Sequence, residues 1–178
     1  SSAIGKINKI AETNLSLSHP KLVRIIEQVK SELGKDPKPK IIILANLTTS
    51  VKSITNALAL ELEGINVSGY IGDDSDNRRK DILKDFSDGR IDVLVTTHDA
   101  VRGDYFPEGQ EGKKYILISY EPDEDTHGIA VNRITKNGAL PLTRDILYVS
   151  QGSMDNAVKN KLLGEPSIAQ SYILSYFY

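Results

Sequence analysis

The chain has 178 residues and a formal net charge of −2, a length that suits one domain with a core of its own. It contains no cysteine, which excludes a disulfide framework, a zinc–thiolate site and a thiol nucleophile. The slight acidic excess argues against a strong, charge-driven grip on duplex DNA, because duplex-binding surfaces are usually basic. No apolar run is long enough to span a bilayer and no signal-peptide core begins the chain, so we expect a cytoplasmic protein without membrane contact.

Hydrophobic periodicity predicts helices and strands that alternate along the chain. In chain order we expect an N-terminal arm or short helix at 1–18, helices at 20–33, 51–62, 78–86, 125–135, 153–163 and 167–176, and strands at 41–45, 65–71, 91–95, 115–120 and 146–150. Pro20 in a first turn, and Gly34 and Gly64 after apolar stripes, mark helix boundaries. The basic run Arg78-Arg-Lys80 is interleaved with aspartates, which indicates an ordinary solvated helix face.

Strands separated by helices of about ten residues indicate βαβ units with right-handed crossovers. We therefore predict an α/β fold of three layers, in which a parallel sheet carries helices on both faces. Ligands of such sheets bind at the carboxyl ends of the strands. The loops after Ala45, Ile71, Val95 and Tyr120 are therefore the candidate sites.

The usual catalytic motifs are absent from the sequence. There is no G-x-x-x-x-G-K-[ST] phosphate loop, no G-x-G-x-x-G after a strand and no G-x-S-x-G elbow. His127 follows three acidic residues, but this pattern is more typical of a solvated turn than of a metal site. We predict no catalytic residue, no metal site and no cofactor for this chain alone.

Phosphate binding without catalysis fits the sequence better. Thr48-Thr-Ser50 begins a helix, whose first backbone amides form a natural anion site. Thr97 and His98 follow a second strand and supply donors at the same edge of the sheet. The alternative is that these hydroxyls only cap helices and satisfy turns, which is the more common role of serine and threonine.

Several motifs together resemble the second RecA-like domain of superfamily 2 helicases, in particular the archaeal Hef and Fanconi-anaemia M type. The matching segments, in order, are His19-Pro-Lys21, the strand 41–45 with Asn46 and Thr48, Gly69-Tyr-Ile-Gly72, Ile82-Leu-Lys-Asp-Phe86, Gly89-Arg-Ile-Asp-Val-Leu-Val-Thr-Thr97, Tyr120-Glu-Pro122 and Asp145-Ile-Leu-Tyr-Val149. The resemblance implies a three-layer RecA-like domain at 19–163, preceded by the arm at 1–18 and followed by a C-terminal helix or tail at 164–178. It also implies contacts to nucleic-acid phosphates from Asn46, Thr48, Thr49, Thr97 and His98.

The sequence departs from this family where the family faces ATP. Tyr105 stands where the family has aspartate, and the last two arginines of the next motif are replaced by Lys136 and Ala139. An arginine finger accelerates phosphoryl transfer by roughly 10³–10⁵, and lysine or alanine cannot reproduce its bidentate fork. We therefore interpret the remaining positions as the remnant of an ATP-facing motif: Arg102, Gly103, Arg133 and Lys136.

Three functions follow as alternatives. The first is a degenerate helicase-type module that binds DNA, branched or single-stranded, or regulates a partner in DNA repair or recombination, without ATP hydrolysis of its own. The second is the motor half of an active DNA helicase, with ATP and Mg²⁺ bound only when a P-loop domain pairs with it. The third is a protein-interaction domain that has lost DNA contact. The apolar stripe from Ile168 to Phe177 predicts a C-terminal aromatic helix that could dock a protein partner.

Overall fold

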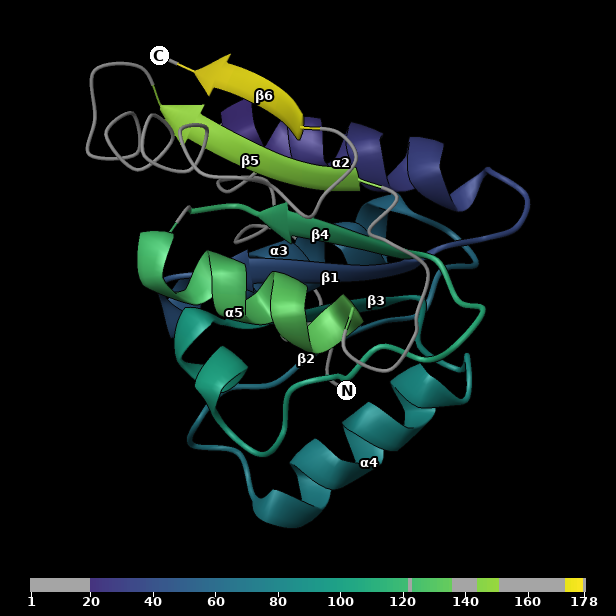
Figure 1. Ribbon diagram of the computed structural model, residues 1–178. Coiled ribbons are helices and arrows are strands. Elements are labelled where there is room, and N and C mark those ends of the chain that lie inside the picture. The colour runs from purple at the N-terminus through teal and green to yellow at the C-terminus, as the bar shows by residue number, and fades with distance from the viewer. Residues whose placement is uncertain (1–19, 122, 136–143, 151–171, 178) are drawn as a thin grey trace, which may run out of the picture.

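The computed structural model describes residues 20–121, 123–135, 144–150 and 172–177. Helices and strands alternate along these segments (Figure 1). The elements are α2 (Pro20–Leu33), β1 (Lys40–Ala45), α3 (Thr48–Glu61), β2 (Val67–Gly69), α4 (Asp76–Ser87), β3 (Val93–Thr97), the 3₁₀ helix η1 (His98–Arg102), β4 (Tyr115–Ser119), α5 (Glu124–Thr135), β5 (Arg144–Ser150) and β6 (Tyr172–Phe177). The predicted helix at 153–163 and the arm at 1–18 lie outside the described residues.

The strands form one six-stranded sheet in the order β2-β3-β1-β4-β5-β6. Every pair of neighbouring strands is parallel, and β1 lies between β3 and β4 with Ile43 opposite both Val95 and Ile118. The carboxyl ends of β1 and β3 therefore meet at one edge of the sheet. This confirms the predicted α/β fold with a parallel sheet.

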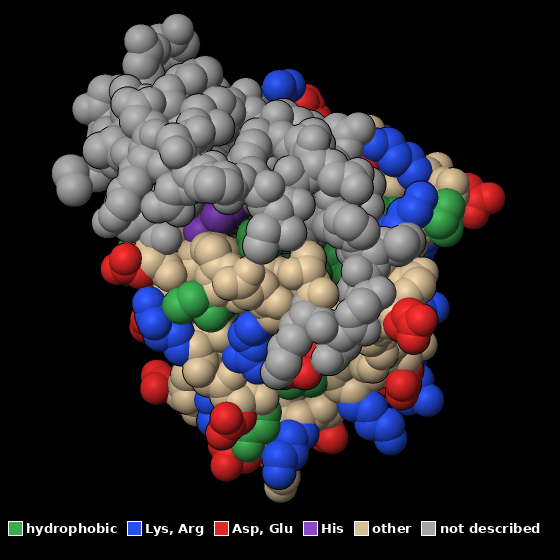
Figure 2. All heavy atoms as spheres, in the orientation of Figure 1, with side chains coloured by type: hydrophobic (Ala, Val, Ile, Leu, Met, Phe, Trp, Pro, Cys, Tyr) green, Lys and Arg blue, Asp and Glu red, His purple; other side chains and the backbone are tan. Residues whose placement is uncertain are grey.

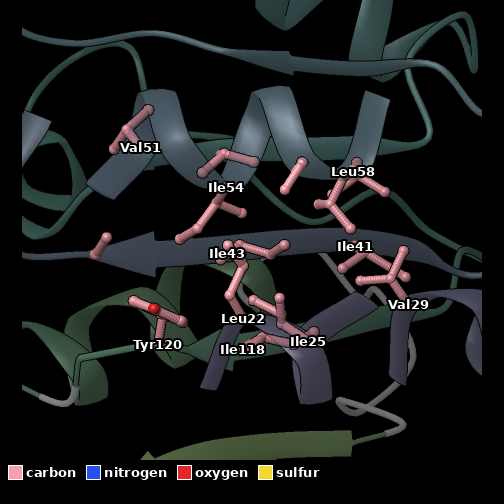
Figure 3. Packing of buried hydrophobic residues seen from close by; sticks show 14 of the residues in the cluster. Leu22, Ile25, Val29, Ile41, Ile43, Val51, Ile54, Leu58, Ile118 and Tyr120 are labelled. Atoms are coloured by element: carbon pink, nitrogen blue, oxygen red, sulfur yellow. The ribbon is translucent and has the colours of Figure 1, made fainter. Parts of the chain in front are cut away.

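Alternating side chains of the central strands supply two separate cores, because successive residues of a strand point to opposite faces. Ile41 and Ile43 pack with α2 and α3, whereas Ile42 and Leu44 belong to the core formed with α4 and α5. Figure 3 shows the first core, where side chains of α2 and α3 meet those of β1. Continuous apolar strands such as 41–45 are buried on both faces, as a sheet between two helical layers requires.

Local signals set the ends of α4, which positions one wall of the site described below. The Ser75 hydroxyl accepts a hydrogen bond from the Arg78 amide at 3.2 Å and so caps the helix N-terminus. Gly89 follows the helix with φ of +82°, a conformation that favours glycine. The Lys40 ammonium donates to the carbonyls of Phe86 and Ser87, so β1 is tied to the last turn of the helix.

Two predictions about local structure are wrong. The segment 172–177, expected within a helix, is strand β6, paired in parallel with β5 from Asp145 to Ser150. Tyrosine, isoleucine and phenylalanine favour strands, and an apolar spacing over so few residues suits a strand as well as a helix. The second correction concerns α3, whose N-cap is Leu47 without a side-chain cap, so Thr48 and Thr49 lie inside the first turn and do not cap it.

Candidate nucleic-acid interface

A cleft of about 460 Å³ opens at the carboxyl edge of the sheet, where the loops after β1, β2 and β3 meet. It is the natural ligand site of such a fold, since strand ends and helix starts converge there. Its lining combines amide, hydroxyl, aromatic and charged groups: Asn46, Thr48, Tyr70, Gly72, Asp73, Arg79, Thr97, Asp99, Ala100, Gly103, Asp104 and Tyr105. Three of the five predicted phosphate contacts, Asn46, Thr48 and Thr97, are among them.

The loop between β1 and α3 forms one wall of the cleft. Asn46 and Thr48 are exposed, and the backbone amide of Asn46 donates to the Glu121 carboxylate at 3.4 Å. No side chain caps the first turn of α3, so its leading amides remain available to an anion. Thr49 is exposed on the same turn but does not belong to the lining of the cleft.

The two threonines at the end of β3 have different roles. Thr96 is fully buried and donates its hydroxyl to the Tyr70 carbonyl at 3.0 Å, which joins β3 to the residue after β2. Thr97 lines the cleft and its side chain does not cap η1, although its backbone is the N-cap of that helix. Thr97 is 6% exposed, and its hydroxyl makes no hydrogen bond to another described residue, so it offers a ligand a small polar surface at the base of the cleft lining.

Arg79 and Tyr105 line another wall of the cleft, and neither was predicted to belong to the phosphate site. The Arg79 guanidinium lies 4.5 Å from the centre of the Tyr105 ring and bonds the Asp76 carboxylate at 2.6 Å. Its Nε is buried and has no hydrogen-bond partner among the described residues. The sequence could have indicated Arg79, because it lies three residues before the buried Ile82 and therefore on the inner side of α4.

Tyr70 fixes the loop that carries Tyr105. Its hydroxyl donates to the Tyr105 carbonyl, and its ring is almost completely buried. Burial raises the pKa of Tyr70 to about 12, so the hydroxyl keeps its proton and remains a donor at any physiological pH. The loop that carries Tyr105 is therefore fixed to the residue that follows β2.

The charges of the cleft are unevenly distributed. Three carboxylates line it, those of Asp73, Asp99 and Asp104, against the single guanidinium of Arg79. The side chains of Asn46, Thr48 and Thr97 are neutral, and the Glu121 carboxylate accepts from the Asn46 backbone amide beside them. The two threonine hydroxyls are neutral donors that an anion in the cleft can use.

His98 does not face this cleft. Its side chain is 4% exposed, its Nδ1 lies 2.8 Å from the Thr126 hydroxyl, and its Nε2 bonds the Glu121 carbonyl. Burial lowers the pKa of His98 below its ordinary range. Both ring nitrogens are thus used inside the protein, and we remove His98 from the predicted phosphate contacts.

Asp123 completes a closed polar corner at the start of α5. Its carboxylate accepts hydrogen bonds from the amides of Asp125 and Thr126 and from the Thr126 hydroxyl, at 3.0–3.1 Å. Burial by itself would raise the pKa of Asp123, but the hydrogen bonds from Thr126 outweigh it and hold the pKa below its usual value. Ser119 and His127 form a second buried contact in the same corner, at 3.3 Å.

Arg133 of α5 binds the protein backbone. Its guanidinium donates to the carbonyls of Val101, Gly103 and Phe106, with distances of 2.7 Å to Val101 and 3.3 Å to Phe106. The residue therefore fastens η1 and the following loop to α5. Of the other residues assigned to the ATP-facing remnant, Arg102 is exposed, Gly103 lines the cleft, and Lys136 lies outside the described residues.

One buried contact explains why two of the sequence motifs occur together. The Lys21 ammonium, on a side chain 3% exposed, donates to the Tyr120 carbonyl at 2.9 Å and lies 5.5 Å from the Tyr120 ring centre. The His-Pro-Lys motif thus anchors α2 to the corner that follows β4. That corner also carries Glu121, which contacts both His98 and the Asn46 amide.

The outer surface shows no large patch of one charge on the face seen in Figure 2, where basic and acidic side chains alternate. On and beside α4, Arg78 pairs with Asp74, Arg79 with Asp76, and Arg90 with Asp85. Arg78 is exposed as predicted for a solvated helix face, whereas Arg79 is half-buried and lines the cleft. None of the helices that the structure describes has the length and apolar character needed to cross a membrane.

Comparison with known proteins gives one family and one fold. Residues 22–108 match the family described as "Helicase conserved C-terminal domain". The chain is 30% identical over 154 residues to the probable ATP-dependent RNA helicase ddx41 of Dictyostelium discoideum, and the match covers 80% of this chain and 22% of that protein. The ATP-dependent RNA helicase RhlB of Psychromonas ingrahamii is 35% identical over 78 residues, with 18% of its length covered.

Solved structures agree with this. The Hef helicase domain of Pyrococcus furiosus is similar with a TM-score of 0.62 and 28% identity, over 80% of this chain and 28% of that one. Domain 2 of the DEAD-box helicase Mss116p, bound to an RNA duplex, has a TM-score of 0.66 at 16% identity, over 89% of this chain and 59% of that one. At that identity the second likeness concerns the fold alone.

Proposed function

The chain belongs to the superfamily 2 helicases through its helicase conserved C-terminal domain, and we propose that this domain is a nucleic-acid-binding module without ATP hydrolysis of its own. The chain spans only about a fifth of the length of the curated relatives it matches. The activity of a longer protein is therefore part of the proposal. The carrying observation is the cleft at the carboxyl edge of β1 and β3, which is lined by the exposed Asn46 and Thr48 and by the nearly buried Thr97.

Phosphate is the ligand group that fits this wall best. Protein–nucleic-acid hydrogen bonds go mainly to phosphate and sugar, and come from hydroxyls, amides and helix N-termini. The wall offers all three kinds of donor: the side-chain amide of Asn46, the hydroxyls of Thr48 and Thr97, and the first backbone amides of α3. Since these donors are neutral, we expect binding that depends less on salt than binding through lysine and arginine.

The proposed absence of ATP hydrolysis is argued from the residues beside this wall. Tyr105 replaces the aspartate expected from the helicase motif, and its ring stacks on Arg79. Arg133, the first arginine of the next motif, is engaged by three backbone carbonyls and therefore does not extend toward a nucleotide on a partner domain. Lys136 in place of the following arginine would supply only a point charge.

The competing proposal is the motor half of an ATP-dependent helicase, with ATP and Mg²⁺ held by a P-loop domain. The names of the curated relatives, which are ATP-dependent RNA helicases, favour it. ATP turnover by the longest natural form of the protein, measured with and without single-stranded nucleic acid, distinguishes the two. Turnover stimulated by nucleic acid would contradict the degenerate module; no turnover above background is the expected result.

The type of nucleic acid also belongs to the proposal. The motifs predict DNA and a role in repair or recombination, whereas the named relatives act on RNA. A phosphate site formed by Thr48 and Thr97 suits either, since both polymers present the same backbone anion. Docking of a protein through a C-terminal aromatic helix is no longer proposed, because residues 172–177 form strand β6.

The test is a double substitution in the neutral wall, Thr48→Val with Thr97→Val. Each change removes a hydroxyl and keeps the side-chain shape, and loss of about 1 kcal/mol per hydrogen bond weakens binding by roughly tenfold or more for the pair. Fluorescence anisotropy with labelled single-stranded DNA and RNA measures this. Thr135→Val is the control, because Thr135 bonds only the carbonyls of α5 at 2.9 and 3.4 Å. Unchanged affinity in the double variant, or no binding by the native chain, would refute the phosphate site.

A further inference from the structure

We propose that Tyr105 and Arg79 form a stacking platform for one unpaired nucleobase, whose phosphate is held by Thr97 and Thr48 in the same cleft. The inference rests on the proposed phosphate site and adds a second, base-binding half to it. The ligand class is therefore a base carried by its own phosphate, from a single strand or from a free nucleotide.

The platform is held rigidly before any ligand arrives. The Arg79 guanidinium lies 4.5 Å from the Tyr105 ring centre and is fixed by the Asp76 carboxylate at 2.6 Å. The backbone of Tyr105 is fixed by the Tyr70 hydroxyl, and the Tyr105 side chain packs partly against the core under α4 and α5. A ring fixed in this way loses little side-chain entropy when a base stacks on it.

The partial exposure of the pair leaves a surface for a planar ligand. Tyr105 is half-buried, Arg79 keeps 22% of its side-chain surface exposed, and both line the cleft. Tyrosine rings and guanidinium planes are the groups on which unstacked bases are usually placed. The volume of about 460 Å³ lies within the range of roughly 300–1,000 Å³ that is typical of small-molecule sites.

The charges of the cleft orient the nucleotide. The carboxylates of Asp73, Asp99 and Asp104 line the cleft and repel a phosphate, but they do not repel a neutral base. They can also accept hydrogen bonds from the amino groups of a base. In the proposed arrangement the phosphate lies at Thr48 and Thr97, and the base lies on Tyr105 and Arg79.

Tyr105 gives this chain an aromatic ring at a position where the helicase motif has a carboxylate. The motif calls for aspartate at this position, and a carboxylate offers no aromatic face. Replacing it by tyrosine would both remove an acceptor and supply the stacking surface. Base–aromatic stacking is worth about 1–3 kcal/mol per base, which corresponds to a gain in affinity of roughly 5- to 150-fold.

The experiment compares three ligands on the whole chain: a labelled single-stranded oligonucleotide, an abasic oligonucleotide of the same length, and adenosine monophosphate as competitor. The native chain is expected to bind the base-bearing strand about tenfold more tightly than the abasic one. Tyr105→Leu keeps apolar packing without a π face and is expected to abolish this preference, as Tyr105→Asp is. Tyr105→Phe, which keeps the ring, is expected to restore it.

Each outcome has one meaning. Equal binding of base-bearing and abasic strands by the native chain overturns the platform and leaves the phosphate site intact. A base preference that survives Tyr105→Leu, in protein whose urea midpoint is unchanged, also overturns it. Competition by adenosine monophosphate that depends on the ring supports the platform and identifies a free nucleotide as the source. If the native chain binds neither strand, both the phosphate site and the platform are refuted.

Discussion

Two polar corners lie at the same edge of the sheet and differ in how their polar groups are satisfied. Between β1 and β3, the hydroxyls of Thr48 and Thr97 line an open cleft. Between β3 and α5, the Thr126 hydroxyl joins His98 to Asp123, and the Glu121 carbonyl takes the second ring nitrogen. The first corner keeps donors for a ligand, whereas the second uses them to fasten the fold.

Position at a strand end therefore does not by itself assign a polar residue to a ligand. Thr97 and His98 are neighbours in the chain and both are nearly buried, yet Thr97 lines the cleft while both ring nitrogens of His98 contact protein groups. The difference arises from α5, which covers η1 and brings Thr126 to the imidazole. Substitutions in the closed corner should cost stability, and those in the open corner should cost binding.

The largest effect is expected for Arg133→Ala in the closed region. The change leaves three carbonyls, those of Val101, Gly103 and Phe106, without their charged donor, and the bonds to Val101 and Phe106 are partly buried. Hydrogen bonds to charged groups are worth about 1.5–3 kcal/mol, so we expect a loss of roughly 2–3 kcal/mol in the free energy of unfolding. Urea denaturation measures it, with Arg133→Lys as a partial rescue. Native stability in the alanine variant would show that Arg133 is free for another role.

A smaller loss is expected for Thr126→Val, which removes the hydroxyl between His98 and Asp123. The substitution keeps the shape of the side chain and leaves the imidazole Nδ1 without its partner. We expect about 1–1.5 kcal/mol of destabilisation in urea, and little change in affinity for nucleic acid. Thr97→Val is the matched change in the open corner and should alter stability by less than about 0.5 kcal/mol. Equal stability of the two variants would remove the distinction between the corners.

The smallest effect is a pH dependence of stability that comes from His98. Its pKa is lowered by burial in the folded chain, so between its ordinary value of 6.5 and the lower folded value the unfolded chain binds more protons. Stability should therefore fall as the pH decreases below about 6.5. The contribution of Asp123 is lost only in more acidic solution, because its pKa is lowered as well.

Urea midpoints from pH 7.5 to 5.5 measure this effect in the native chain and in His98→Gln. The glutamine amide can still donate to the Glu121 carbonyl, but it does not titrate. The variant should be less stable at neutral pH and should show a weaker pH dependence than the native chain. A native chain whose stability is constant or rises toward pH 5.5, relative to the variant, would contradict the lowering of the His98 pKa by burial.

Most of the fold could be predicted from the sequence, because its buried strands are continuous apolar runs. Ile41–Ala45 and Tyr115–Ser119 carry an unambiguous signal for a parallel sheet between helical layers. Strand β6 was not predicted, because aromatic and β-branched residues over six positions fit the period of a helix as well as that of a strand. Its identity depends on the pairing with β5, which is a long-range property.

The candidate site was predicted in part for a similar reason. Asn46, Thr48 and Thr97 follow strands directly, so topology alone brings them to one edge. The positions of Arg79 and Tyr105 depend on how α4 and the loop after η1 pack, and residue spacing does not encode that contact. The burial of His98 depends on Thr126, which is 28 residues away in the chain.

The central place of β1 has a consequence for how the chain folds during synthesis. Its two neighbours, β3 and β4, are made later, and the second of them ends only at Ser119. Closing such long loops costs entropy before any pairing repays it, so folding of this sheet is expected to be slow. Until Ser119 has emerged from the ribosome, the apolar strand Ile41–Ala45 lacks one of its partners and remains open to aggregation or to a chaperone.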